Sequence, residues 1–252
     1  MVSGACPISG RSLADRVVEL QRDGLTVVEG LLSPEELQEA RSALDRVFAR
    51  PYDPRLDAPG YSVDSGAAGE PLLALPDGSR FATNLLSKDP LFAGWIAREP
   101  VWSLVRSLIA DPMLSSLNAL EPVRGSGHQT LHRDEGPVGD EGVVTLNTLW
   151  ALDDMDRGNG ATRYVPGTFL TGELADDDDP RVRYVSVRAG TVIVMNAHML
   201  HGASLNADGR RRRVVHVYYT RQGRVAQTPW VRYVPPSVRE ALSPRQRRLI
   251  GL

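Results

Sequence analysis

Cysteine is almost missing from this chain, since Cys6 is the only one among 252 residues. A single thiol excludes an internal disulfide framework and any thiolate-rich zinc site. The lack of disulfides is typical of proteins that work in a reducing compartment, so we expect a cytoplasmic location.

An excess of positive charge is also lacking. The chain has 29 Lys+Arg against 31 Asp+Glu, a formal net charge of −2, whereas nucleic-acid-binding proteins usually carry a strongly basic surface. No stretch approaches the roughly 18 apolar residues that cross a bilayer, and Arg11, Asp15 and Glu19 interrupt any signal-peptide pattern near the N-terminus. We therefore expect neither a nucleic acid nor a membrane as a partner.

The first part of the chain has the pattern of a strand between two helices. Apolar spacing predicts a helix over residues 11–21 and a strand over 25–28. The sequence Ser33-Pro34-Glu35-Glu36 combines an N-cap, a proline in the first turn and a capping box, so a second helix is predicted to begin there. Residues 51–80 are rich in Pro, Gly, Asp and Ser, and a loop of this length is usually functional. We expect it to form a lid.

Beyond Asp111 short β-branched and aromatic runs alternate with glycine-containing turns. These runs predict strands over residues 116–123, 130–132, 143–152, 161–165, 183–187, 191–196 and 212–219. Many short strands at this spacing indicate an antiparallel sandwich or barrel with helices grouped at one end. Because 252 residues can bury one core, we interpret residues 1–252 as a single domain, mainly β with flanking helices.

Histidine and aspartate in the β-rich part form a candidate metal site. His132 and Asp134 are two residues apart, so both side chains project from one face of a strand. A further predicted strand leads to His198 and His201, and the spacing alone does not choose between these two as a third ligand. Two histidines and one carboxylate on one side of a metal suit non-haem Fe(II), although catalytic zinc takes the same ligands.

Four consecutive arginines, Arg210–Arg213, follow the second histidine cluster. On a strand, alternate members of the run would face opposite sides, so two of the four would point toward the barrel interior. A guanidinium buried there needs a partner, and a carboxylate bound through two hydrogen bonds is the best match. Arg212 is therefore a candidate clamp for a dicarboxylate cosubstrate.

Together these segments resemble the phytanoyl-CoA dioxygenase family, a branch of the Fe(II)/2-oxoglutarate-dependent oxygenases. The resemblance covers most of the chain and rests on its opening strand and helix, a Q-x-L-H-x-D segment, a middle block and the distal-histidine block. In this sequence these are residues 23–36, 129–134, 150–168 and 189–212. The family usually has Ser two residues after the distal histidine, where this chain has Ala203.

The resemblance implies a double-stranded β-helix, a jelly-roll barrel with helices packed on one sheet. It implies iron ligation by His132, Asp134 and His201, with His198 nearby but not a ligand, and pairing of Arg212 with the far carboxylate of 2-oxoglutarate. Further positions similar to cosubstrate-binding ones in the family are Gln129, Thr162 and Trp150. Asn84 and Arg80, near the end of the expected lid, are candidate substrate contacts.

The activity implied by the resemblance uses Fe(II), 2-oxoglutarate and O2, with succinate and CO2 as products. The substrate would be a small molecule, and an arginine-rich chain of this size is similar to bacterial tailoring enzymes of secondary metabolism. Because Asp134 is retained, hydroxylation of an unactivated C–H is favoured over halogenation. His216, Tyr218 and Tyr219 are interpreted as barrel packing.

Other functions stay open at this point. The same iron centre could support desaturation, cyclisation or epoxidation. From a different class, the chain could be a non-catalytic jelly-roll protein that binds a metal or ligand, or a zinc hydrolase or lyase with the same triad. Arg212 and Thr162 discriminate against the hydrolase, since it has no need of a dicarboxylate clamp.

Overall fold

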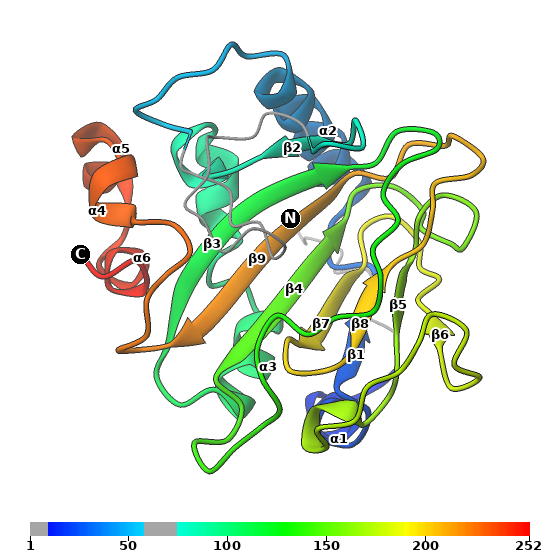
Figure 1. The fold of residues 1–252 in the computed structure, drawn as a ribbon. Helices are drawn as coiled ribbons and strands as arrows, with labels where there is room; N and C mark the ends of the chain where they lie inside the picture. Colours follow the sequence, from blue (N-terminus) through cyan, green and yellow to red (C-terminus); the bar gives the residue numbers. More distant parts are fainter. Residues whose placement is uncertain (1–9, 58–74) are drawn as a thin grey trace.

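Two antiparallel sheets form the centre of the computed structural model, which describes residues 10–57 and 75–252 (Figure 1). The larger sheet has six strands in the order β1-β7-β4-β9-β3-β2. Their bounds are β1 (Leu25–Val28), β7 (Val192–Asn196), β4 (Thr145–Ala151), β9 (Val214–Arg221), β3 (Pro112–Glu121) and β2 (Arg80–Ala82). The smaller sheet has the order β6-β5-β8, with β6 (Arg183–Tyr184), β5 (Thr162–Tyr164) and β8 (His201–Ala203).

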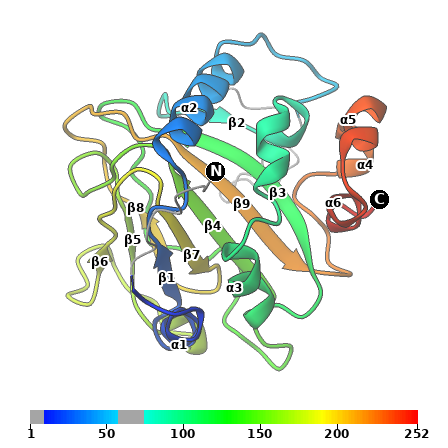
Figure 2. The same ribbon diagram turned by 180° about the vertical axis from the view of Figure 1, so that it is seen from behind.

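Helices cover one face of the large sheet. Figure 2 shows α2 and α3 in front of it and the C-terminal helices beside it. The helices are α1 (Leu13–Asp23), α2 (Pro34–Phe48), α3 (Val101–Leu108), α4 (Trp230–Tyr233), α5 (Pro236–Ala241) and α6 (Pro244–Leu249). The predicted start of α2 is confirmed, because Ser33 and Glu36 form the capping box. In the part of the chain that the structure describes, no helix is long and apolar enough to cross a membrane.

The alternation of side chains along the central strands separates two apolar clusters. On the helix-facing side of β4, Leu146 and Trp150 pack with side chains of α2 and α3. Leu149 points to the other side and packs with Ile193 of β7 and Phe169, beneath the small sheet. Successive residues of a strand face opposite sides, so every second residue of β4 and β9 faces the space between the two sheets. The fold is thus mainly β with flanking helices, as predicted.

The segment that carries the histidine–aspartate motif is not the regular strand predicted over residues 130–132. It meets β8 through an isolated bridge, in which His132 and His201 exchange two backbone hydrogen bonds of 2.8 and 2.9 Å, and through the Gln129 amide, which donates to the carbonyl of Ala203. Gly202 explains why the two segments come so close: a Cβ atom there would lie 2.7 Å from the carbonyl oxygen of Gln129. Only glycine leaves room for that backbone.

The expected lid is described only at its two ends, and residues 58–74 of it lie outside the described residues. Its first end is anchored, because the buried carboxylate of Asp57 forms an ion pair with the buried ammonium of Lys88. Its last residue, Arg80, begins β2 and pairs in register with Glu121 of β3.

Candidate metal centre

His132, Asp134 and His201 converge, with one ligand atom from each lying within 4.8 Å of the other two. The Nε2 atom of His132 is 3.5 Å from Oδ1 of Asp134, and Nε2 of His201 is 3.6 Å from Oδ2 of the same carboxylate. Two imidazole nitrogens and a carboxylate on one side of a shared point are the donor set of a facial metal site. The residues present therefore fit an Fe(II) ion.

Backbone carbonyls hold both imidazoles in the orientation that a ligand requires. Nδ1 of His132 donates a hydrogen bond to the carbonyl of Thr130, and Nδ1 of His201 donates to the carbonyl of Met199, each at 2.9 Å. With the proton on Nδ1, the Nε2 atom of a neutral ring is the one that can bind a metal. Asp134 is fixed by its own amide, which donates to the carbonyl of Ala197 at 3.1 Å.

The electrostatics of the site also favour the ligating protonation states. Burial lowers the pKa of His201, which keeps its imidazole neutral. Burial by itself would raise the pKa of Asp134, but the neighbouring His201 and His132 outweigh it and lower that pKa. A carboxylate and neutral imidazoles are the forms that coordinate a cation.

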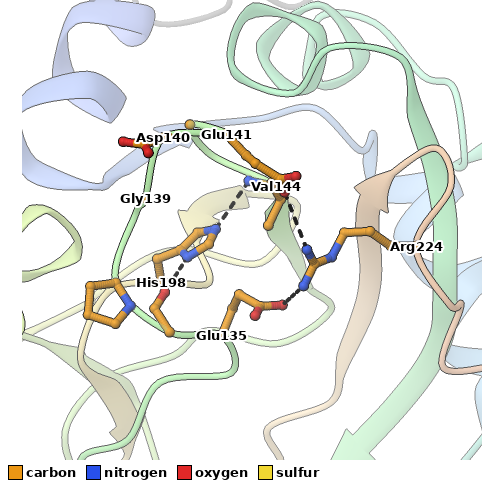
Figure 3. Close-up of a pocket in the computed structure, with 10 residues that line it drawn as sticks. Glu135, Gly139, Asp140, Glu141, Val144, His198 and Arg224 are labelled. Carbon is orange, nitrogen blue, oxygen red and sulfur yellow. Dashed lines mark hydrogen bonds and ion pairs between the residues drawn. The ribbon is translucent and has the colours of Figure 1, made fainter.

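His198 has no ring nitrogen left for a metal. Its Nε2 accepts the amide hydrogen of Val144 at 3.1 Å, and its Nδ1 donates to the carbonyl of Gly136. Figure 3 shows this ring joining the loop after Asp134 to the start of β4, beside a pocket that also holds the Glu135–Arg224 ion pair. The structure thereby brings His201, and not His198, to the triad.

The arginine run has a different arrangement from the predicted alternation, because it precedes β9 rather than lying within it. Two neighbours, Arg212 and Arg213, are both buried, whereas Arg210 and Arg211 are half-exposed and bind surface carboxylates. Arg213 forms a two-pronged ion pair with Asp153.

Arg212 alone in this run has no acidic partner among the described residues. Its Nε lies 3.4 Å from Sδ of Met155, and it is 2 % exposed. Burial with no compensating charge lowers the pKa of Arg212 to about 10. A buried guanidinium without a carboxylate is ready to bind one from a ligand.

The other predicted cosubstrate contacts divide into two groups. Thr162 is buried and pairs with Ala203 across β5 and β8, so it shares the face of β8 from which His201 projects. Gln129 lies next to Ala203, whose carbonyl accepts its amide hydrogen at 3.0 Å, but its side chain is exposed.

Trp150 requires a correction, because its ring lies on the helix-facing side of β4. It stacks on Trp95 with ring centroids 4.7 Å apart, and its Nε1 donates to Thr148. Strand alternation therefore turns it away from the metal triad.

The two candidate substrate contacts both have partners within the chain, and their contact with a substrate stays a prediction. The half-exposed Arg80 forms an ion pair with Glu121 at 3.3 Å. The Asn84 amide nitrogen donates to the carbonyls of Leu56 and Tyr233, so this side chain links two segments that are distant in sequence.

Sequence reasoning missed Asn147, His216 and Tyr218, which lie on the inner face of β4 and β9. Asp134 interacts electrostatically with both His216 and Tyr218. Burial, and next the positive charge of Arg212, lower the pKa of His216 to about 3. A signal for His216 and Tyr218 was available, since residues 214, 216 and 218 share one face of β9 at the strand period of two.

Comparisons with known proteins identify the family of the chain. The family model described as phytanoyl-CoA dioxygenase matches residues 20–214. The dioxygenase cnsJ of Penicillium expansum is 26% identical over 246 residues, which cover 84% of this chain and 68% of the relative. The Fe(II)/2-oxoglutarate-dependent dioxygenase nvfF of Aspergillus novofumigatus is 25% identical, with 92% and 79% covered.

Among solved structures, HygX from Streptomyces hygroscopicus with nickel and 2-oxoglutarate bound has a similar fold. The TM-score is 0.68 at 16% identity, with 86% of this chain and 90% of HygX covered. The chain belongs to the phytanoyl-CoA dioxygenase family, and its predicted class, an oxygenase that depends on Fe(II) and 2-oxoglutarate, is confirmed.

Proposed function

From this family membership we propose that the protein hydroxylates an unactivated C–H bond of a small molecule, with Fe(II) held by His132, Asp134 and His201. The observation that carries the proposal is the convergence of these three ligands within 4.8 Å. Fe(II) with 2-oxoglutarate and O2 would supply the oxidising chemistry, while 2-oxoglutarate is converted to succinate and CO2. The two sheets would correspond to the faces of a double-stranded β-helix.

The chain's own residues bind and orient the reactants. The unpaired guanidinium of Arg212 would bind the far carboxylate of 2-oxoglutarate, because a bidentate carboxylate satisfies its charge and its donors. Thr162 would contact the same cosubstrate from β5. The carbonyls of Thr130 and Met199 keep the imidazoles turned toward the metal position throughout.

The substrate proposed is an intermediate of secondary metabolism. The chain is similar to the fungal dioxygenases described above, and this arginine-rich chain resembles bacterial tailoring enzymes in size and composition. Hydroxylation is favoured because Asp134 occupies the third ligand position. Desaturation or cyclisation would give a product that has not gained an oxygen atom, which mass spectrometry detects. Epoxidation would add one oxygen atom without a new hydroxyl group, which chemical derivatisation detects.

The proposal is tested first without the substrate. Anaerobic addition of Fe(II) and then 2-oxoglutarate should produce a visible charge-transfer absorption, and admission of O2 should release succinate slowly. His132→Ala should abolish both signals. His128→Ala, which removes a half-exposed imidazole outside the triad, should retain both.

Two outcomes would overturn the proposal. One is an absorption or a succinate signal in His132→Ala equal to that of the unchanged protein. The other is tight Fe(II) binding with no effect of 2-oxoglutarate, which would favour the non-catalytic metal-binding alternative.

A further inference from the structure

The inner face of the large sheet carries a polar patch beside the metal triad. Thr145 and Asn147 of β4 lie in register with Thr220 and Tyr218 of β9, and His216 is diagonal to Asn147. Farther along the same face the side chains are apolar, with Leu149 opposite His216 and packed in the inner cluster. The uncharged polar side chains of β4 and β9 therefore lie together at the end of this face that approaches Asp134, and the buried Arg212 lies beyond the apolar stretch.

Two buried atoms of this patch have no hydrogen-bond partner, Oδ1 of Asn147 and Nε2 of His216, whereas the side chain of Thr145 has Tyr218 as a hydrogen-bond partner. Thr145 is 4 % and Asn147 is 7 % exposed. A buried polar atom without a partner costs folding free energy, and native structures contain few of them. Two such atoms side by side on adjacent strands call for a function.

The one hydrogen bond inside the patch defines what it offers a ligand. The Asn147 amide nitrogen lies 3.2 Å from Nδ1 of His216, and an amide nitrogen can only donate. The lone pair of the neutral ring is therefore on Nδ1 and its hydrogen is on Nε2. The pair leaves one donor, Nε2–H of His216, and one acceptor, Oδ1 of Asn147, both uncharged.

A donor and an acceptor without charge match a ligand group that both accepts and donates, such as a hydroxyl or a carboxamide. A carboxylate only accepts hydrogen bonds, so it would leave Oδ1 of Asn147 without a donor. An ammonium only donates, so it would leave Nε2–H of His216 without an acceptor. The far carboxylate of the cosubstrate already has Arg212, whose positive charge acts on His216. The polar patch is thus left for the other reactant.

We propose that Asn147 and His216 are specificity-determining residues that bind a neutral hydroxyl or carboxamide group of the substrate and so place its reacting carbon beside the metal. This inference rests on the proposed function, because it assigns the patch to the substrate of that site. The inference goes beyond the proposed function because it states which polar group the substrate carries.

The test measures binding of matched probes by fluorine NMR to protein loaded with Ni(II) and 2-oxoglutarate, which fill their own positions without turnover. The probes share one ring: para-fluorobenzyl alcohol, para-fluorobenzamide, para-fluorobenzoate, para-fluorobenzylamine and para-fluorotoluene. The alcohol and the amide are expected to bind roughly threefold to tenfold more tightly than the toluene, the range for one or two neutral hydrogen bonds. The charged probes should gain no such preference.

Substitutions then locate the preference. Asn147→Leu and His216→Phe should each bring the alcohol to within about twofold of the toluene, while toluene binding stays unchanged. His216→Gln, whose amide can donate from nearly the same place, should restore part of the preference. Thr148→Val is the matched control, because Thr148 is the next residue of β4 and bonds on the opposite face.

Several results would overturn the inference. Equal binding of alcohol and toluene to the unchanged protein would do so without any variant. A preference that survives both Asn147→Leu and His216→Phe would place the polar contact elsewhere, and tighter binding of the benzoate would mark an anion site. Failure of the proposed function is seen separately, as failure of the unchanged protein to bind Ni(II) and 2-oxoglutarate.

Discussion

Replacing Arg212 by methionine should separate the stability of the protein from its binding of 2-oxoglutarate. Arg212 is 2 % exposed, and its pKa is lowered to about 10 by burial. From an ordinary value near 12.5, this corresponds to about 3 kcal/mol against the charged form. Methionine removes that charge and can pack against Met155, so the free energy of unfolding of the metal-free protein should rise by about 1 to 3 kcal/mol.

Binding of 2-oxoglutarate should change in the opposite direction. Two charge-assisted hydrogen bonds to a carboxylate contribute about 1.5 to 3 kcal/mol each, so Arg212→Met should weaken binding at least about a hundredfold. Urea denaturation measures the first effect, and calorimetric titration of the Ni(II)-loaded protein measures the second.

Arg213→Met is the matched control for this experiment. Arg213 is buried to a similar extent but is paired with Asp153. Its loss leaves a buried carboxylate without a partner and should cost about 3 to 5 kcal/mol of stability, with little change in cosubstrate affinity. If Arg212→Met destabilises the protein as much as Arg213→Met does and leaves 2-oxoglutarate affinity intact, the assignment of Arg212 as the clamp is refuted.

Three further predictions follow from buried groups around the site. His198→Phe should lower the free energy of unfolding by about 1 to 3 kcal/mol, since the Val144 amide loses its acceptor, while calorimetry should show unchanged Ni(II) affinity. Trp150→Phe should cost at least about 1 kcal/mol through lost stacking but leave 2-oxoglutarate affinity unaltered; a large loss of affinity would return Trp150 to the site. Burial raises the pKa of Asp153, but the ion pair with Arg213 outweighs burial and lowers that pKa in the folded protein. The ionised carboxylate therefore stabilises the fold above the unfolded carboxyl pKa of about 4, and this stabilisation is lost as the pH falls through the lower folded pKa. Asp153→Asn should therefore flatten the acid limb of a plot of unfolding free energy against pH, and an unchanged slope would contradict the ion pair.

The sequence by itself determined the elements whose signals are local. Ser33 caps α2 because the N-cap, the proline and the capping glutamate all lie within one helical turn. The His132–Asp134 pair and the two downstream histidines were recognisable because metal ligands are few and chemically distinctive. Charge and cysteine content restricted the class of protein for the same reason: they are sums over residues and need no knowledge of contacts.

Only the tertiary structure decided which side chains face the metal. His198 and His201 are equivalent in type, and the amide of Val144, far away in sequence, occupies the ring nitrogen of His198. Trp150 and Asn147 lie on one strand but on opposite faces. Which of the two faces points to the metal is decided when β4 pairs with β7 and β9. Arg212 and Arg213 differ because only Arg213 meets a buried carboxylate. Such choices depend on residues that folding brings together from separate parts of the chain, so no local pattern contains them.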